Sequence, residues 1–121
     1  MPAVRALRGA TTVDADTEDQ INERVQALVA AMLESNDISK DDLISIIFTA
    51  TDDITAMFPA TAARAMGLGD VPLLCARELD VKGGTPLVIR VLMQMQTEKS
   101  RGDLHHVYLE GARALRDDLP E

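Results

Sequence analysis

One arginine lies in the middle of an apolar segment, and its chemistry is the clearest signal in this sequence. Arg90 stands within LVIRVLM, residues 87–93, with three apolar residues on each side. A guanidinium group in such a segment carries a large desolvation cost unless an acceptor pairs with it. Two interpretations are open. Arg90 forms a structural ion pair or extends its stem to the rim of a sheet, or it binds an anion from a rigid strand.

Four further side chains stand at or near the ends of expected strands. Glu78 follows the VPLLC segment and is either an exposed acid or a carboxylate placed opposite Arg90. Arg8, at the end of its strand, could line a ligand crevice, and the Tyr108 hydroxyl could bind a carboxylate, although a surface arginine and a tyrosine that packs with its oxygen in water are commoner. The lone Cys75 is expected to be a buried, inert thiol.

The sequence contains no convincing nucleophile, metal site or cofactor motif. His105 and His106 are adjacent, so on a strand they face opposite sides, and with one cysteine they make a poor ligand set for a metal. Glycine-rich nucleotide loops and the G-x-S-x-G motif are missing from the sequence. The combination suits a binding protein for small carboxylates, or an enzyme that works by shape and electrostatics alone.

The elements that must position these residues form a mixed sheet with one long helix. Thr17 and Gln20 make a T-x-x-Q capping box, and apolar residues then recur at helical spacing, so a helix is predicted over 18–35. Gly9 is expected to end the first strand and Gly67 to end a second, short helix. The expected strands are 3–8, 43–50, 71–75, 87–97 and 105–109, and the short helices are 59–66 and 110–115. In the strand over 87–97 the odd-numbered residues face one side and Arg90 faces the other. This order predicts one α/β or α+β domain, residues 1–121, with about five strands.

Composition excludes several classes of function. The 121 residues are 46% hydrophobic and carry a net charge of −8, which argues against a partner with a phosphate backbone. Three aromatic residues are too few for a base-stacking platform. No apolar run approaches the ~20 residues that cross a bilayer. The first ten residues lack the apolar core of a signal peptide, and a single cysteine cannot form an intramolecular disulfide, so we expect a cytoplasmic protein.

Charge is distributed unevenly along the chain. Residues 1–60 have a balance of −7 and residues 61–121 a balance of −1, so most of the cations lie in the second half. Nine of the twelve basic residues are arginine, which grips planar carboxylates through two parallel hydrogen bonds. This distribution favours a small anionic ligand.

Most of the chain also resembles a known family, the monofunctional chorismate mutases of the AroH class. The matching segments are RALRGATTV (5–13), DTEDQI (16–21), FPATAAR (58–64), VPLLCARELDVKGG (71–84), IRVLMQMQT (89–97) and HHVYLEGARALRDDL (105–119). They occur in the family's order. The resemblance implies a homotrimer of mixed sheets packed as a pseudo-α/β barrel, an architecture related to that of RidA proteins, with active sites at the subunit interfaces.

The activity implied by this resemblance is the Claisen rearrangement of chorismate to prephenate, on the route to phenylalanine and tyrosine. It uses no cofactor, no metal and no covalent intermediate. By the same resemblance, Arg90 would bind the ether oxygen and a carboxylate, and Glu78 would stabilise positive character on the ring. Cys75 would contact the region of the ring hydroxyl as a weak polar partner.

The resemblance assigns binding roles to six more residues. Arg8 and Tyr108 would hold a substrate carboxylate, Phe58 and Leu115 would supply apolar walls, and Arg64 would help to bind the dianion. Arg116 and the C-terminal segment would order over the mouth of the site. Thr61 stands where family members often carry lysine, and the loop between Arg64 and Val71 is about one residue shorter than theirs. Two other functions stay open, a non-catalytic trimeric binder of small carboxylates and an imine deaminase of the RidA kind.

Overall fold

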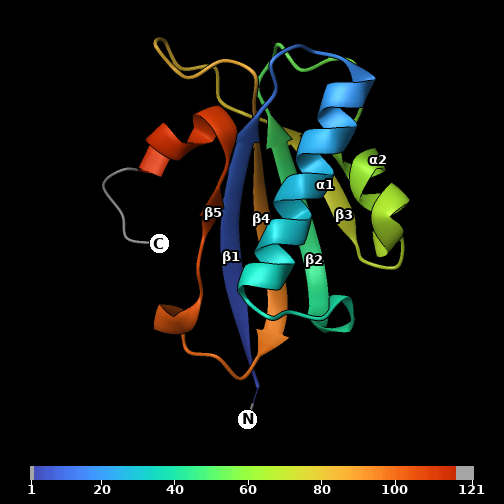
Figure 1. Cartoon of the computed structure of the whole chain (residues 1–121), viewed down its shortest axis with the longest axis vertical. Coiled ribbons are helices and arrows are strands. Elements are labelled where there is room, and N and C mark those ends of the chain that lie inside the picture. Colours follow the sequence, from blue (N-terminus) through green and yellow to red (C-terminus); the bar gives the residue numbers. More distant parts are fainter. Residues whose placement is uncertain (1, 117–121) are drawn as a thin grey trace.

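Five strands form one mixed sheet in the computed structural model, which describes residues 2–116 (Figure 1). The strands are β1 (Ala3–Thr12), β2 (Leu43–Ala50), β3 (Leu73–Arg77), β4 (Val88–Thr97) and β5 (Val107–Tyr108), in the spatial order β3-β2-β4-β1-β5. The β1–β4 and β2–β4 pairs are antiparallel, and the β2–β3 and β1–β5 pairs are parallel. The predicted mixed sheet of about five strands is therefore confirmed.

The long helix α1 (Glu18–Ser35) lies across one face of the sheet, and the short helix α2 (Pro59–Ala63) packs beside it (Figure 1). Helix α1 begins at the predicted cap, because Thr17 Oγ1 accepts a hydrogen bond from Gln20 N at 3.2 Å. The chain continues from α2 into the π-helical turn η2 (Arg64–Leu68), and residues 2–116 also contain three 3-10 turns. These are η1 (Lys40–Asp42), η3 (Arg101–Asp103) and η4 (Glu110–Arg116).

The two faces of β4 differ as its alternating sequence predicts. Ile89, Val91, Met93 and Met95 are buried in the core beneath α1, whereas Arg90, Leu92 and Gln94 are only partly buried. Neither α1 nor α2 covers this second face. Cross-strand register places Arg8, Thr49 and Leu74 on it as well, and we call it the open face.

Gly9 does not end the first strand, contrary to the sequence prediction, because β1 continues through it to Thr12. A Cβ atom at Gly9 would lie 2.5 Å from the sulfur of Met32 and 3.2 Å from a methyl group of Leu28, both on α1. Gly9 therefore allows α1 to pack close to the sheet, and it does not form a turn. Sequence reasoning gave it the wrong role because a tertiary contact has no local signature.

Replacing Gly9 by alanine is expected to destabilise the protein by about 1–3 kcal/mol, the usual cost of overpacking a dense core. Urea unfolding would measure the loss. The matched control is Gly69→Ala, because Gly69 has a right-handed helical backbone and an added Cβ there meets nothing within 4 Å. Equal stability of the Gly9→Ala variant and the wild type would contradict this account of α1 packing.

Several boundaries differ from the sequence predictions by a few residues. β3 covers 73–77 and not 71–75, and β5 contains two residues and not five. The predicted helix over 59–66 divides at residue 63. Gly67, the predicted end of this helix, does interrupt the helical backbone with a φ of 97°, although η2 extends to Leu68. β4 starts at Val88 because Leu87 has a φ of 55°, outside the strand region. Among residues 2–116, no helix is long and apolar enough to cross a membrane.

Candidate active site

Four of the predicted site residues line one hollow of about 280 Å³ on the open face, which we call the arginine pocket. They are Arg8, Glu78, Arg90 and Tyr108. The sheet order explains how they meet. Ala10 of β1 pairs with Arg90 on one side and with Tyr108 on the other, so residues distant in the sequence flank a single position.

Arg90 and Glu78 form an ion pair, with Nε of the arginine 3.2 Å from Oε2 of the glutamate. The Arg90 side chain is still 41% exposed and that of Glu78 25% exposed. The two interpretations of Arg90 therefore do not exclude each other, because the ion pair leaves part of the guanidinium group open to a ligand. Glu78 is fixed at its backbone, where its N–H donates to the carbonyl oxygen of Ala50 at 2.9 Å.

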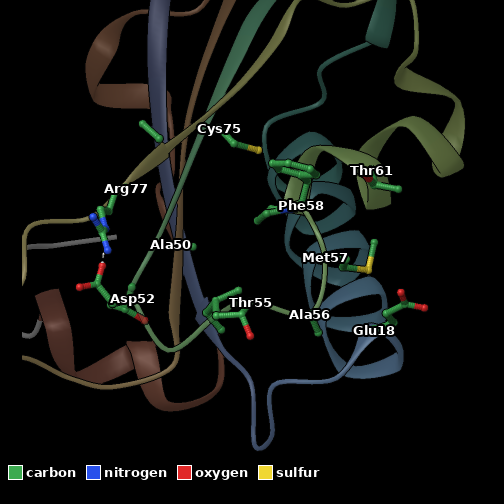
Figure 2. Close-up of a pocket in the computed structure, with 14 residues that line it drawn as sticks. Glu18, Ala50, Asp52, Thr55, Ala56, Met57, Phe58, Thr61, Cys75 and Arg77 are labelled. Carbon is green, nitrogen blue, oxygen red and sulfur yellow. Dashed lines mark hydrogen bonds and ion pairs between the residues drawn. The ribbon is translucent and has the colours of Figure 1, made fainter.

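A second, larger hollow lies beside α2 (Figure 2) and has a volume of about 740 Å³. We call it the phenylalanine pocket, since Phe58 lines it and is 70% exposed. Cys75 and Thr61 also line it. Cys75 pairs with Phe48, whose side chain is fully buried on the helix-covered face, so within one chain the thiol faces away from Arg90. Cys75 is half-buried, and the expectation of a buried thiol is thus only partly met.

The remaining predicted site residues do not join either pocket within the described chain. Arg64 is exposed at the start of η2, and Leu115 is half-buried in η4. Arg116 is the last residue of η4, and its side chain lies outside the described part. No group of three or more histidine, cysteine or acidic residues within 2–116 is arranged to hold a metal ion.

Asp16 anchors the loop that leads to Phe58. Its carboxylate accepts hydrogen bonds from N and Oγ1 of Thr55 and from N of Ala56, at 2.6–3.0 Å. The hydrogen bond from the Thr55 side chain, followed by those from the two backbone N–H groups, lowers the pKa of Asp16 below its ordinary value of 3.8. The charged carboxylate is therefore the form that holds this loop.

An Asp16→Asn variant is expected to be less stable than the wild type at neutral pH. Because the pKa of Asp16 is lower in the folded state, its contribution is complete above 3.8 and disappears as the pH falls through the folded value. Thermal unfolding between pH 7 and pH 2 should therefore show a difference between variant and wild type that shrinks at acid pH. The control is Asp70→Asn in an exposed loop. A difference that stayed constant over this range would contradict the role of the Asp16 charge.

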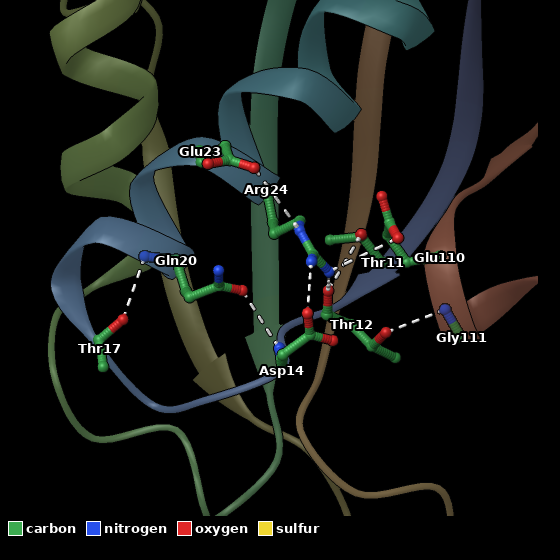
Figure 3. Close-up of polar contacts among 9 residues, drawn as sticks. All are labelled: Thr11, Thr12, Asp14, Thr17, Gln20, Glu23, Arg24, Glu110 and Gly111. Atoms are coloured by element: carbon green, nitrogen blue, oxygen red, sulfur yellow. Dashed lines mark hydrogen bonds and ion pairs between the residues drawn. The ribbon is translucent and has the colours of Figure 1, made fainter.

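Arg24 ties η4 to the sheet and to α1 (Figure 3), and its side chain is only 11% exposed. Its Nη1 donates to the carbonyl oxygen of Thr12 at 2.6 Å and lies 3.7 Å from a carboxylate oxygen of Glu110. Its Nη2 donates to Asp14 at 3.0 Å. Gly111 N donates to Thr12 Oγ1 at 3.0 Å. Periodicity places Arg24 on an outer face of the helix and therefore missed this role.

Asn36 holds the segment that leads to β5. It is 1% exposed, its Oδ1 accepts from His105 N at 2.6 Å, and its Nδ2 donates to the carbonyl oxygens of His105 and Met32, each at 2.9 Å. Next along the chain, His106 Nδ1 accepts from Arg8 N at 3.0 Å. These contacts fix the approach to Tyr108, and the sequence contains no pattern that marks Asn36 for this role.

The sheet sets Arg8 and Arg90 on neighbouring strands beside one pocket, an arrangement suited to a small anionic ligand. Comparisons with known proteins show the family. The family model "Chorismate mutase type I" matches residues 4–119. Chorismate mutase AroH of Thermus thermophilus is 48% identical over 117 residues, which cover 96% of each chain. Chorismate mutase AroH of Bacillus subtilis is 41% identical over 117 residues, or 96% of this chain and 92% of that one.

A solved structure agrees with the sequence relatives. The chorismate mutase of Clostridium thermocellum has a TM-score of 0.89 and 48% sequence identity, with 91% of this chain and 98% of that chain covered. The chain belongs to the chorismate mutase type I family.

Proposed function

We propose that the arginine pocket is the catalytic centre of this protein and that Arg90 and Glu78 carry its chemistry. As a chorismate mutase, the protein isomerises chorismate to prephenate. The ion pair of Arg90 with Glu78, in a hollow that also holds Arg8 and Tyr108, is the observation that supports this assignment. It puts donors and a carboxylate in one preorganised site.

The rearrangement breaks the ether C–O bond and forms a C–C bond within one molecule, with no proton, electron or group exchanged. Negative charge grows on the ether oxygen as the C–O bond stretches. Arg90 donates hydrogen bonds to this oxygen more strongly in the transition state than in the ground state, which lowers the barrier. Glu78 stabilises the positive character of the ring and accepts a hydrogen bond from the ring hydroxyl.

The other residues bind and fold the substrate. Arg8 and Tyr108 hold a carboxylate, and Arg64 with Arg116 attracts the dianion against the acidic charge of the chain. Phe58 and Leu115 supply apolar walls that favour the folded conformer. Cys75 is a weak polar neighbour of the ring hydroxyl and not a nucleophile.

We further propose a homotrimer in the cytoplasm, in which the arginine pocket of one subunit meets the phenylalanine pocket of the next. The two pockets lie on opposite sides of the sheet, so a ligand cannot contact both pockets of the same chain. Exposed apolar side chains support an interface, because Leu74 on the open face is 60% exposed and Phe58 is 70% exposed. Sedimentation equilibrium of the purified protein would test the number of subunits.

Mixing two variants tests whether each site draws on two subunits. Arg90→Ala is expected to be inactive alone. Arg64→Ala is expected to lose most of its activity at low chorismate concentration, because Arg64 lies at the C-terminal end of α2, the helix that lines the phenylalanine pocket. After unfolding and refolding together in equal amounts, they should recover about a quarter of wild-type activity, since random assembly pairs an intact Arg90 with an intact Arg64 at that frequency. No recovery in a correctly assembled mixture would contradict a shared site.

The activity itself is tested by mixing the protein with chorismate and following the loss of its diene absorbance. Acid conversion of the product to phenylpyruvate would identify prephenate. Saturable turnover that disappears in a folded Arg90→Ala variant would support the arginine pocket as the catalytic centre. Binding of chorismate without turnover would indicate a carboxylate sensor instead, and turnover of imines without turnover of chorismate would indicate a deaminase.

A further inference from the structure

We propose that Thr49 is a positioning residue, which turns the Glu78 carboxylate so that the terminal nitrogens of Arg90 stay free for the substrate. This inference rests on the proposed function of the arginine pocket. Thr49 lies on β2, faces Arg90 across the β2–β4 pair, and lines the same hollow. Neither the apolar strand pattern nor the family resemblance assigns it a role.

The hydrogen bond between Thr49 and Glu78 is short. Thr49 Oγ1 donates to Oε2 of Glu78 at 2.6 Å, and the same oxygen lies 3.2 Å from Nε of Arg90. The carbonyl oxygen of Ala50, the next residue of β2, accepts a hydrogen bond from the backbone N–H of Glu78 at 2.9 Å. Two successive residues of β2 therefore fix Glu78, one at its backbone and one at its carboxylate.

The contact between Arg90 and Glu78 is electrostatic and not a well-formed hydrogen bond. Nε of Arg90 is buried, yet it has no hydrogen-bonded partner among the described residues. Oε2 of Glu78 is directed to the Thr49 hydroxyl instead. Arg90 and Glu78 consequently do not adopt the two-bond fork that arginine and carboxylate groups otherwise prefer.

The position of Thr49 has a chemical consequence for both catalytic residues. Without the Thr49 hydroxyl, the Glu78 carboxylate is expected to rotate toward Arg90 and to form the two-bond ion pair. The terminal nitrogens of Arg90 would then bind the enzyme's own carboxylate and not the ether oxygen of the substrate. Oε1 of Glu78, which has no hydrogen-bond partner among residues 2–116, would then turn toward Arg90 and away from the substrate ring. Both losses act on the transition state more than on substrate binding.

The test removes the hydroxyl of Thr49 and keeps the shape of its side chain. Thr49→Val retains a β-branched side chain suited to a strand, and we expect its kcat to fall about 10- to 100-fold, the size of one hydrogen bond to a charged group, with a smaller change in KM. Thr49→Ser restores a hydroxyl and should recover most of kcat. The matched control is Ser45→Ala, because Ser45 also lies on β2 and donates to a β4 side chain, Gln94, at 2.8 Å. This control should keep wild-type kcat.

A double-mutant cycle separates positioning from a general loss of structure. If Thr49 acts through Glu78, Thr49→Val should change kcat less than about twofold in a Glu78→Gln background. An equal loss of kcat in both backgrounds, or wild-type kcat in Thr49→Val alone, would overturn the proposal. Turnover of chorismate by the unmodified protein is measured first, so failure of the proposed function is distinguished from failure of this inference.

Discussion

Replacing Arg90 by lysine is expected to lower kcat by about 10²- to 10³-fold, the range measured when one preorganised donor to a developing negative charge is removed. Lysine keeps the positive charge but has a single compact ammonium group. It cannot face Glu78 and hold the ether oxygen at the same time, as the planar guanidinium group can. Steady-state kinetics with chorismate would measure the loss.

The control for this variant is Arg101→Lys, an equivalent change at an exposed residue of η3, away from both pockets. It should keep wild-type kinetics. Circular dichroism and sedimentation should show the same fold and assembly for both variants and the wild type. Wild-type kcat in a folded Arg90→Lys variant would remove Arg90 from the mechanism, since the positive charge alone would then suffice.

The largest expected effect on stability follows replacement of Asn36 by alanine. This change leaves the backbone N–H and carbonyl groups of His105 without their partners and opens a small cavity at the end of α1. Unsatisfied groups of this kind cost about 1–3 kcal/mol each, so the two groups of His105 together predict a loss of about 2–6 kcal/mol. Thermal unfolding should show a Tm lower by about 10 °C or more for a domain of this size.

Asn22→Ala is the matched control, because Asn22 lies on α1, the helix that Asn36 caps, but is exposed and contacts only Gln26 at 3.3 Å among the hydrogen bonds of the described residues. Its stability should change by less than about 0.5 kcal/mol. Asn36→Ala should also raise KM, since the loosened segment carries Tyr108. Equal melting temperatures for the two variants would contradict the structural role of Asn36.

Local patterns predicted the elements that depend on local signals. The cap at Thr17, the apolar spacing of α1 and the alternation of β4 each occur within a few turns or residues of chain, and the structure has all three. The role of Gly9 was predicted wrongly, because it depends on a helix twenty residues away. The two-residue length of β5 depends on its pairing with β1, which no local pattern encodes.

The candidate site was predictable to a similar extent. An arginine within an apolar strand and an acid at a strand end indicated Arg90 and Glu78, and the structure brings them to 3.2 Å. The roles of Thr49, Asn36 and Arg24 could not be predicted, because cross-strand register and helix contacts alone place these side chains. The positions of Cys75 and Phe58 in a separate pocket likewise depend on which face of the sheet each strand presents.

The strand order has a consequence for how the protein is made on the ribosome. β1 is synthesised before the other four described strands, but both of its neighbours, β4 and β5, lie after residue 87. Until Val88–Thr97 has left the exit tunnel, β1 has no partner and β2 has one unpaired side. Exposed strand edges of this kind template aggregation. Both edges of β1 therefore stay open to pairing with other chains while the second half of the protein is translated, since α1 packs on the face of this strand and not on its edges.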